Sequence, residues 1–398
     1  MALLLKNAHV IDPQVGLNET CEVLVRDGRI VEVGHGLTMA KGVERDLGGK
    51  IVVPGLVDMH VHLREPGLEQ KEDIASGTRA AAHGGFTAVC CMPNTKPVID
   101  NAVGVEYVAA RAAAVVGERD GRGVQGAGMM RRVMDYAAPF DRVVMSHCQD
   151  EDLVGEGQVN EGVVSTRLGM LGWPAAGEEI QIARDIALCR LTGCPLHVQH
   201  LTTARGLELV RAAKAEGLPV TCEVTPHHLF LTEDALRDDY NTALKVNPPL
   251  RTAEDAAALV EGVVDGTVDA IVTDHAPHVD FEKDREFELA PFGMIGLETS
   301  LALVITHLVA PGVISWERAV ELMAVAPRRI LRLERVALEP GSTADLTVID
   351  PDAAWTVDPA DFLSKATNSG FVGAELTGRA TDVYVAGYAT LEDGAIVE

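Results

Sequence analysis

Short apolar runs alternate with helical patterns through the middle of the chain, and this alternation limits the fold more than any other feature. Six runs have the length of buried parallel strands: Val52–Met59, Thr87–Met92, Val143–His147, Leu196–His200, Val220–Val224 and Ala270–Thr273. Helical periodicity lies between them, as at Glu178–Leu191, Ala204–Ala215 and Ala253–Val263. Repeated strand–helix units of this size predict a doubly wound sheet or a closed α/β barrel. No glycine-rich nucleotide-binding fingerprint follows any of these strands, which favours the barrel.

Both ends of the chain have a different character, because short β-strand patterns replace the strand–helix units. These patterns are Leu3–Leu5, Val23–Val25, Ile30–Val33, Ala344–Ile349, Val383–Ala386 and Gly394–Val397. A turn at Asp27–Gly28 joins two of them, as expected of a hairpin. We therefore expect residues 1–53 and 339–398 to build one small β-sandwich domain beside a TIM-like (β/α) barrel of residues 54–338.

The charge of the chain argues against two classes of partner. Acidic residues number 59 against 34 basic ones, and the formal net charge is −25, so we expect no general affinity for nucleic acid or for an anionic membrane. No apolar stretch approaches the ~20 residues of a membrane span, and no secretory signal pattern is visible. The seven cysteines include no CxxC pair, which favours reduced thiols. We therefore expect a soluble, cytoplasmic protein.

Histidine and aspartate residues fall at the carboxyl ends of several predicted strands. His60 and His62 close the first strand, and strand alternation places residues i and i+2 on one face. His147, His200 and Asp274 end or follow later strands. In a barrel these strand ends meet at one face, where such folds place their chemistry. Each residue alone could be a hydrogen-bonded core residue, but their convergence predicts a metal site.

Imidazole and carboxylate ligands without cysteine suit zinc or a similar divalent ion in a partly open, catalytic site. Such an ion lowers the pKa of its bound water towards 7 and supplies hydroxide at neutral pH. Asp274 would accept the proton of that water and later donate it to a leaving nitrogen, as general base and then general acid. The pattern therefore predicts a metal-dependent hydrolase.

Several longer motifs resemble one known family. They are His60-Val61-His62-Leu63-Arg64-Glu65-Pro66-Gly67, Met92-Pro93-Asn94-Thr95, Lys245-Val246-Asn247-Pro248-Pro249-Leu250-Arg251, Asp274-His275-Ala276-Pro277-His278 and Phe292-Gly293 followed by Gly296-Leu297-Glu298-Thr299. Their order and spacing resemble the long bacterial dihydroorotases of the amidohydrolase superfamily, across nearly the whole chain. The joint match is specific, because amidohydrolases in general do not need the Leu-Arg-Glu-Pro-Gly or Lys-Val-Asn-Pro-Pro-Leu-Arg segments.

The resemblance implies a role for individual residues. The positions that match metal ligands for one or two zinc ions are His60, His62, Asp120, His147, His200 and Asp274. Asp120 matches an aspartate that replaces, in this branch, the carboxylated lysine that bridges two metals elsewhere. Arg64, Asn94 and His278 match residues that hold the substrate carboxylate, and Asn247 matches a contact to the pyrimidine ring. From the residues alone, Arg64 could instead form a surface salt bridge, and Asn94 could only shape a turn.

The implied reaction is the reversible interconversion of N-carbamoyl-L-aspartate and L-dihydroorotate, a step of pyrimidine synthesis. The resemblance also implies a homo-oligomer, or a complex with aspartate carbamoyltransferase. Another cyclic-amide hydrolase, such as a hydantoinase or an allantoinase, is the alternative among enzymes. Those typically use a carboxylated lysine, and no lysine lies at the matching place near Asp120.

The chain departs from the family between Thr95 and Asp120, where we expect about 30 residues to be missing, because one βα unit takes roughly that length. The family has its third and fourth barrel strands here, whereas this chain has one helix pattern, Val105–Ala114, and carries Arg119 where relatives have a second acidic residue. Either this sequence omits residues that the intact protein has, or the deletion is real and the barrel lacks two strands.

A real deletion would allow a different class of function. Asp120 would then not reach the metal, and the chain would be a non-catalytic partner of aspartate carbamoyltransferase. Inactive relatives typically lose their metal histidines, whereas four histidines and Asp274 are present here. The sequence therefore favours the enzyme.

Overall fold

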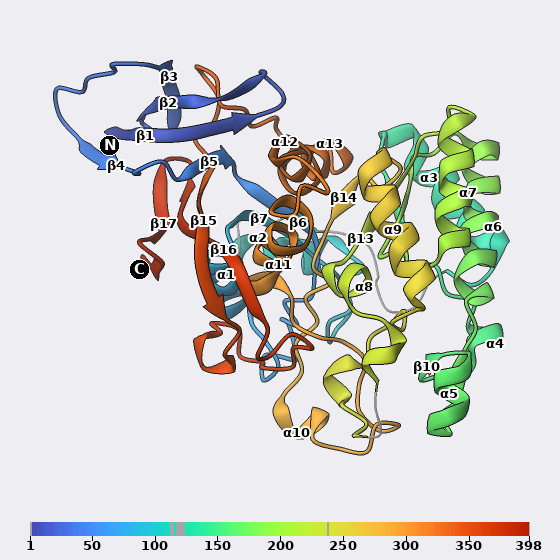
Figure 1. Ribbon diagram of the computed structural model, residues 1–398. Coiled ribbons are helices and arrows are strands. Elements are labelled where there is room, and N and C mark those ends of the chain that lie inside the picture. The colour runs from blue at the N-terminus through green and yellow to red at the C-terminus, as the bar shows by residue number, and fades with distance from the viewer. Residues whose placement is uncertain (1, 112–114, 117–123, 237–238, 398) are drawn as a thin grey trace.

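A barrel of parallel strands with helices around it forms the larger part of the molecule, and a β domain lies beside it (Figure 1). The computed structural model describes residues 2–111, 115–116, 124–236 and 239–397. The α/β barrel predicted from the alternation of apolar runs is confirmed. Among the described residues, no helix is long and apolar enough to cross a membrane.

The barrel strands pair in two parallel groups. The strands are β6 (Leu56–Val61), β7 (Phe86–Cys91), β8 (Val115–Val116), β9 (Val144–Ser146), β12 (Leu196–Val198), β13 (Val220–Val224) and β14 (Ala270–Ile271). One sheet has the order β6-β7-β8, and the other has the order β14-β13-β12-β9. A parallel bridge between Val61 and His275, with a 2.8 Å bond from His62 N to His275 O, joins the two groups. The ends of β6 and β14 are therefore adjacent.

The other boundary between the two groups lies between β8 and β9. The sequence predicts that two barrel strands are missing here. One strand is nevertheless present, because β8 pairs in parallel with β7 through two residues. Within the described residues no pairing joins β8 to β9. A cavity of about 1360 Å³ lies on this side, lined mainly by residues from 93 to 105 and from 124 to 147, and it reaches His147.

The helices cover the outside of the barrel. The longer ones are α1 (Ile74–His83), α2 (Ala102–Arg111), α3 (Ala127–Ala137), α6 (Ala176–Thr192), α7 (Ala204–Ala215), α9 (Ala253–Asp265) and α11 (Leu297–Val304). The shorter ones are α4 (Glu151–Val154), α5 (Val163–Leu168), α8 (Pro226–Phe230), α10 (Asp280–Lys283), α12 (Trp316–Val320) and α13 (Ala326–Ile330). Thr203 and Thr252 cap α7 and α9, because each hydroxyl accepts a backbone N–H of the first turn. α7 packs between α6 and α9 (Figure 1).

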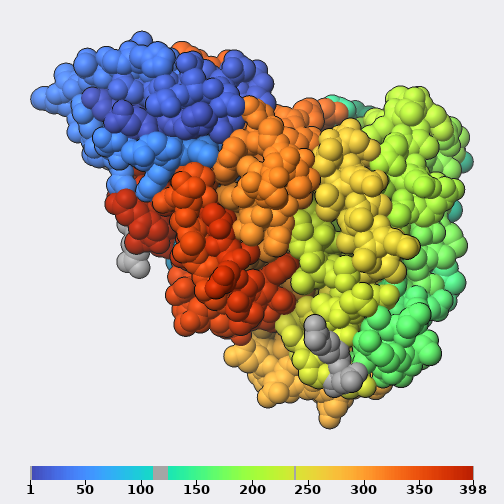
Figure 2. Space-filling model, viewed as in Figure 1, coloured from blue at the N-terminus to red at the C-terminus, as the bar shows by residue number. Residues whose placement is uncertain are grey.

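The two ends of the chain form the β domain, as the sequence predicts. Its strands are β1 (Ala2–Asp12), β2 (Leu17–Arg26), β3 (Arg29–Gly34), β4 (Val43–Asp46), β5 (Ile51–Pro54), β15 (Leu346–Thr356), β16 (Glu375–Val385), β17 (Tyr388–Glu392) and β18 (Ala395–Ile396). They make one hydrogen-bonded sheet in the order β18-β17-β16-β15-β5-β1-β2-β3, with β4 beside β1. Apolar side chains from both ends, such as Val10, Val23 and Leu346, share one core. In Figure 2 the N-terminal part of the β domain, coloured blue, projects from the rest of the molecule.

One predicted strand is wrong in its extent. The run Val52–Met59 is two strands, because β5 pairs with β1 and β15 in the β domain whereas β6 pairs with β7 in the barrel. The chain changes sheets at Gly55, where a Cβ atom would lie only 2.2 Å from the Thr87 Oγ1 atom. An unbroken apolar run does not reveal such a change, because both strands are buried.

Candidate metal centre

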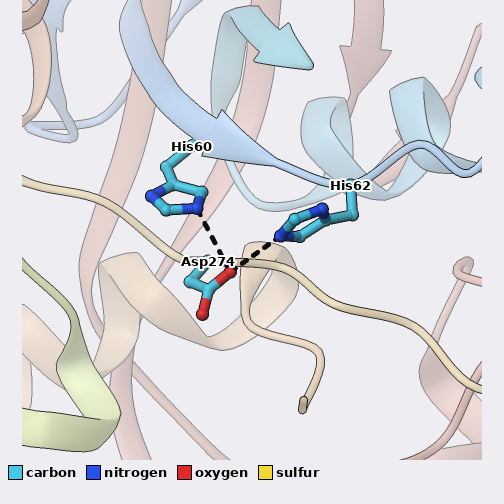
Figure 3. A group of neighbouring side chains, drawn as sticks. All are labelled: His60, His62 and Asp274. Carbon is cyan, nitrogen blue, oxygen red and sulfur yellow. Dashed lines mark hydrogen bonds and ion pairs between the residues drawn. The ribbon is translucent and has the colours of Figure 1, made fainter. Parts of the chain in front are cut away.

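Three buried side chains from two strand ends form the centre of the site (Figure 3). His60 and His62 lie at the end of β6, and Asp274 follows β14. The Asp274 Oδ1 atom is 3.4 Å from His60 Nε2 and 3.0 Å from His62 Nε2. One ligand atom of each residue lies within 4.8 Å of the others. Two imidazole nitrogens and a carboxylate oxygen at these separations fit a divalent cation.

The outer nitrogens of both histidines are held by other side chains. His60 Nδ1 is 2.5 Å from Glu223 Oε1, on β13, and His62 Nδ1 donates to Asn94 Oδ1 at 2.9 Å. Bonds of this kind fix the tautomer and the ring orientation of a metal-binding histidine. They turn the Nε2 atoms of His60 and His62 toward Asp274.

Glu223 is a charged group inside the barrel. Its side chain is fully buried, contacts His197 Nε2 at 3.0 Å and accepts from the backbone N of His200 at 3.3 Å. Burial would raise the pKa of Glu223, but the charges of His60 and His197 and their hydrogen bonds outweigh it and lower that pKa to about 2. The carboxylate is therefore ionised at neutral pH.

Strained backbone accompanies the site. Arg64, His200 and Asp274 have φ angles of 61°, 28° and 46°, in the left-handed region that residues other than glycine rarely adopt. Such strain persists only where the surroundings enforce it, and it gathers at functional sites. Around Asp274, Thr273 N donates to the buried Asp58 carboxylate, and His275 N donates to Thr273 Oγ1 at 3.0 Å.

A second pair of histidines lies beside the first group. His147 follows β9 and His200 follows β12, and their Nδ1 and Nε2 atoms are 2.7 Å apart. The His60 and His200 ring centroids are 5.2 Å apart. His147 Nε2 donates to Gln149 Oε1 at 2.8 Å, which turns Nδ1 inward. The structure thus brings together all five strand-end residues singled out in the sequence. Asp120, the sixth proposed ligand, lies outside the described residues.

Arg64 and His278 lie next to each other at the edge of this centre. Arg64 Nη2 is 3.4 Å from His278 Nε2, and both side chains are largely buried. The His278 ring donates to the Phe292 carbonyl at 2.8 Å. Burial first, and then the charges of Arg64 and Lys71, lower the pKa of His278 to about 2, so the ring is neutral at physiological pH. The Arg64 guanidinium, held beside this neutral ring, suits a ligand carboxylate.

Two asparagines complete the set of predicted contacts. The oxygen of Asn94 is engaged by His62, and its NH₂ group keeps donors for a ligand. Asn247 Nδ2 donates to Gln149 Oε1 at 3.0 Å, whereas the buried Asn247 Oδ1 atom has no hydrogen-bond partner among the described residues. A buried acceptor of this kind costs free energy unless a ligand or water satisfies it.

Glu223 and Gln149 were not singled out in the sequence. Glu223 carried a signal, because it is a lone acidic residue inside the apolar run Val220–Val224. Gln149 stands two positions after His147, the same spacing that joins His60 to His62. The amide of Gln149 connects His147 to Asn247.

Comparison of the sequence with known proteins gives one family. A family described as dihydro-orotase-like matches residues 49–117 and 111–205. The dihydroorotase of Pelotomaculum thermopropionicum is 46% identical over 427 positions that cover 100% of both chains. That of Pelobacter propionicus is 48% identical and covers 97% of this chain and 99% of its own. Among solved structures, the L-hydantoinase of Arthrobacter aurescens has a TM-score of 0.90 at 25% identity, covering 100% of this chain and 97% of its own.

The same comparisons bear on the shortened stretch. The alignment with the Pelotomaculum protein runs over 427 positions and this chain has 398 residues, so at least 29 of those positions have no residue here. The two segments matched by the family description meet at residues 111–117, inside the stretch from Thr95 to Asp120. The number agrees with the shortening expected from the motif spacing.

Proposed function

The chain belongs to the dihydroorotase family, and from this membership we propose how its own residues carry out the reaction. It is a cyclic amidohydrolase that interconverts N-carbamoyl-L-aspartate and L-dihydroorotate. The observation that carries the residue assignment is the buried group of His60, His62 and Asp274, with the pair of Arg64 and His278 at its edge.

We propose that His60, His62 and Asp274 hold a zinc ion, and that His147 and His200, with Asp120, hold a second. The donor set supports zinc, because it offers nitrogen and carboxylate oxygen in a buried site without thiolates. A bound divalent ion would polarise the amide carbonyl and lower the pKa of water. Glu223, Asn94 and Gln149 would keep the ligand nitrogens in place.

Asp274 is the proposed proton carrier. In hydrolysis its carboxylate would accept the proton of the attacking water and donate it to the ring nitrogen as the amide bond breaks. In the cyclisation direction it would accept a proton from the carbamoyl nitrogen and donate it to the departing hydroxide. The hydrogen bonds of Thr273 N and His275 N on either side of Asp274 favour a fixed carboxylate position.

Arg64, His278 and Asn94 are proposed to bind the substrate carboxylate, and Asn247 the ring. The guanidinium beside His278 supports a carboxylate-bearing substrate. The buried Asn247 Oδ1 atom would accept a ring N–H. This set also distinguishes the proposal from a hydantoinase or an allantoinase, which has less need of a carboxylate clamp.

Turnover of N-carbamoyl-L-aspartate should require a metal and should disappear after chelation and return when zinc is added. Hydantoin and allantoin serve as comparison substrates in the same assay. A zinc-loaded chain that cyclises no carbamoyl-aspartate would refute the activity and favour the non-catalytic scaffold. A cytoplasmic location, a homo-oligomer and a complex with aspartate carbamoyltransferase remain predictions, which fractionation and size-exclusion chromatography of the two proteins would test.

A further inference from the structure

A segment of the C-terminal region contacts the loops around Arg64 and His278, the pair that we call the carboxylate clamp. It connects β15 to β16 and includes Asn368, whose side chain is 7% exposed. The side chain of Asn368 makes three hydrogen bonds, and all three go to backbone atoms of two loops that carry site residues. Its Oδ1 atom accepts from His278 N at 3.1 Å, and its Nδ2 atom donates to Ala276 O at 3.2 Å and to Gly293 O at 3.0 Å.

One peptide unit receives support from both sides. The carbonyl of Pro277 accepts from Arg64 Nε at 3.2 Å, and the N–H of the same peptide unit, on His278, donates to Asn368. Arg64 and Asn368 therefore fix the orientation of this unit together. Because a peptide unit is planar, a rotation that breaks one of these bonds also displaces the other.

The second loop is held by the same amide. Gly293 lies against the clamp so closely that a Cβ atom there would be 2.7 Å from the Ala276 Cβ and 3.2 Å from His278 Nε2. The neighbouring Phe292 carbonyl accepts the His278 ring N–H at 2.8 Å. Asn368 Nδ2 thus ties together the loop that carries His278 and the loop that orients its ring.

We infer that Asn368 is a positioning residue for substrate binding, acting through the peptide unit of Pro277 and His278 on Arg64. This inference rests on the proposed function, because it takes Arg64 and His278 as the carboxylate clamp. Among the described residues, the hydrogen bonds of the Asn368 side chain go to these two loops and not to His60, His62 or Asp274. Its loss should therefore weaken substrate binding and leave metal binding unchanged.

The test is a double-mutant cycle with Asn368→Ala and Arg64→Met in the zinc-loaded enzyme. Asn368→Ala alone should raise KM for N-carbamoyl-L-aspartate about tenfold, since small misplacements of binding groups have effects of this size or larger. Its kcat should stay within about threefold of the wild-type value, and its zinc content should be unchanged. In the Arg64→Met background the same substitution should change KM less than about twofold, because residues acting through one group are not additive. Thr367→Val is the matched control, since the Thr367 hydroxyl donates only to Asp280 in the same segment; its KM should match that of the wild type.

Each outcome decides one of the two claims. Equal fold-changes in KM in both backgrounds, or an unchanged KM in Asn368→Ala, would overturn the positioning role. If the wild-type chain shows no turnover, the proposed function fails, and the role of Asn368 is judged from L-dihydroorotate binding by calorimetry. Equal affinities of wild type and Asn368→Ala in that measurement would overturn it.

Discussion

The carboxylate of Glu223 should control how tightly the site holds its metal. Glu223 is fully buried on β13, 2.5 Å from His60 Nδ1 and 3.0 Å from His197 Nε2. Substitution Glu223→Gln keeps the size and the acceptor oxygen of the side chain but removes its charge. With the amide oxygen facing His60, the bond to His60 loses its charge assistance, and the acceptor oxygen that faces His197 is replaced by an NH₂ group.

The size of the effect follows from that loss. A hydrogen bond to a charged group contributes roughly 1.5–3 kcal/mol, and a neutral one about 0.5–1.5 kcal/mol. The difference is about 1 kcal/mol or slightly more, which corresponds to a five- to tenfold weaker zinc affinity. This value lies at or just below the 10- to 100-fold range of effects that partners of metal-bound histidines typically have.

Zinc affinity is measured by competition with a chromophoric chelator at neutral pH. Glu298→Gln is the matched control, because Glu298 also pairs with a histidine in the interior, at 2.7 Å from His83 Nδ1. Its other hydrogen bonds within the described residues come from the backbone of Leu363 and Ser364. The control should bind zinc as the wild type does. An affinity of Glu223→Gln equal to that of the control would refute the reasoning, since it would mean that the orientation of His60 does not depend on this charge.

Three further substitutions test other parts of the site. Asp274→Asn should lower turnover by at least about 10²-fold, the usual size of general acid–base catalysis, with an unchanged circular dichroism spectrum; activity above a tenth of wild type would contradict the proton role. Arg64→Lys should raise KM for N-carbamoyl-L-aspartate about tenfold with kcat nearly unchanged, because an ammonium cannot form the guanidinium fork; an unaltered KM would remove Arg64 from the clamp. Burial, and then the charges of Lys245 and Arg64, lower the pKa of Lys283 to about 7, with a smaller opposing effect of Glu282. The unfolded chain therefore binds this proton more tightly, so the free energy of unfolding should rise between pH 7 and about 10. Lys283→Met should flatten that rise in urea denaturation, and parallel curves would contradict the assignment.

Local patterns predicted many elements well. The bounds of β13 and α7 agree with the predicted Val220–Val224 and Ala204–Ala215. Both have clear boundaries in the sequence, since Pro219 precedes the strand and the Thr203 cap precedes the helix. β17 was not predicted, because Tyr388 and its neighbours are mostly half-exposed and lack a continuous apolar run. Such a strand is determined by its pairing with β16.

Long-range pairing explains what the sequence could not show about the site. The strand-end positions of His60, His62 and Asp274 were visible, because the barrel rule brings those ends together. The partners behind them were not visible. Glu223 lies 163 residues from His60, and Asn368 lies 90 residues from His278. Neither belongs to a motif, and a buried polar side chain has meaning only when its partner is known.

The two proposed metal positions differ in how much they depend on the shortened stretch. His60, His62 and Asp274 come from β6 and the end of β14, which are joined by the bridge between Val61 and His275. This side of the barrel is closed whether or not residues are missing elsewhere. The second position, at His147 and His200, relies on Asp120, which lies in the stretch that the motif spacing predicts to be shorter than in the family. Because Asp274, the proposed proton carrier, and the pair of Arg64 and His278 lie on the closed side, the groups proposed for proton transfer and carboxylate binding do not depend on the short stretch.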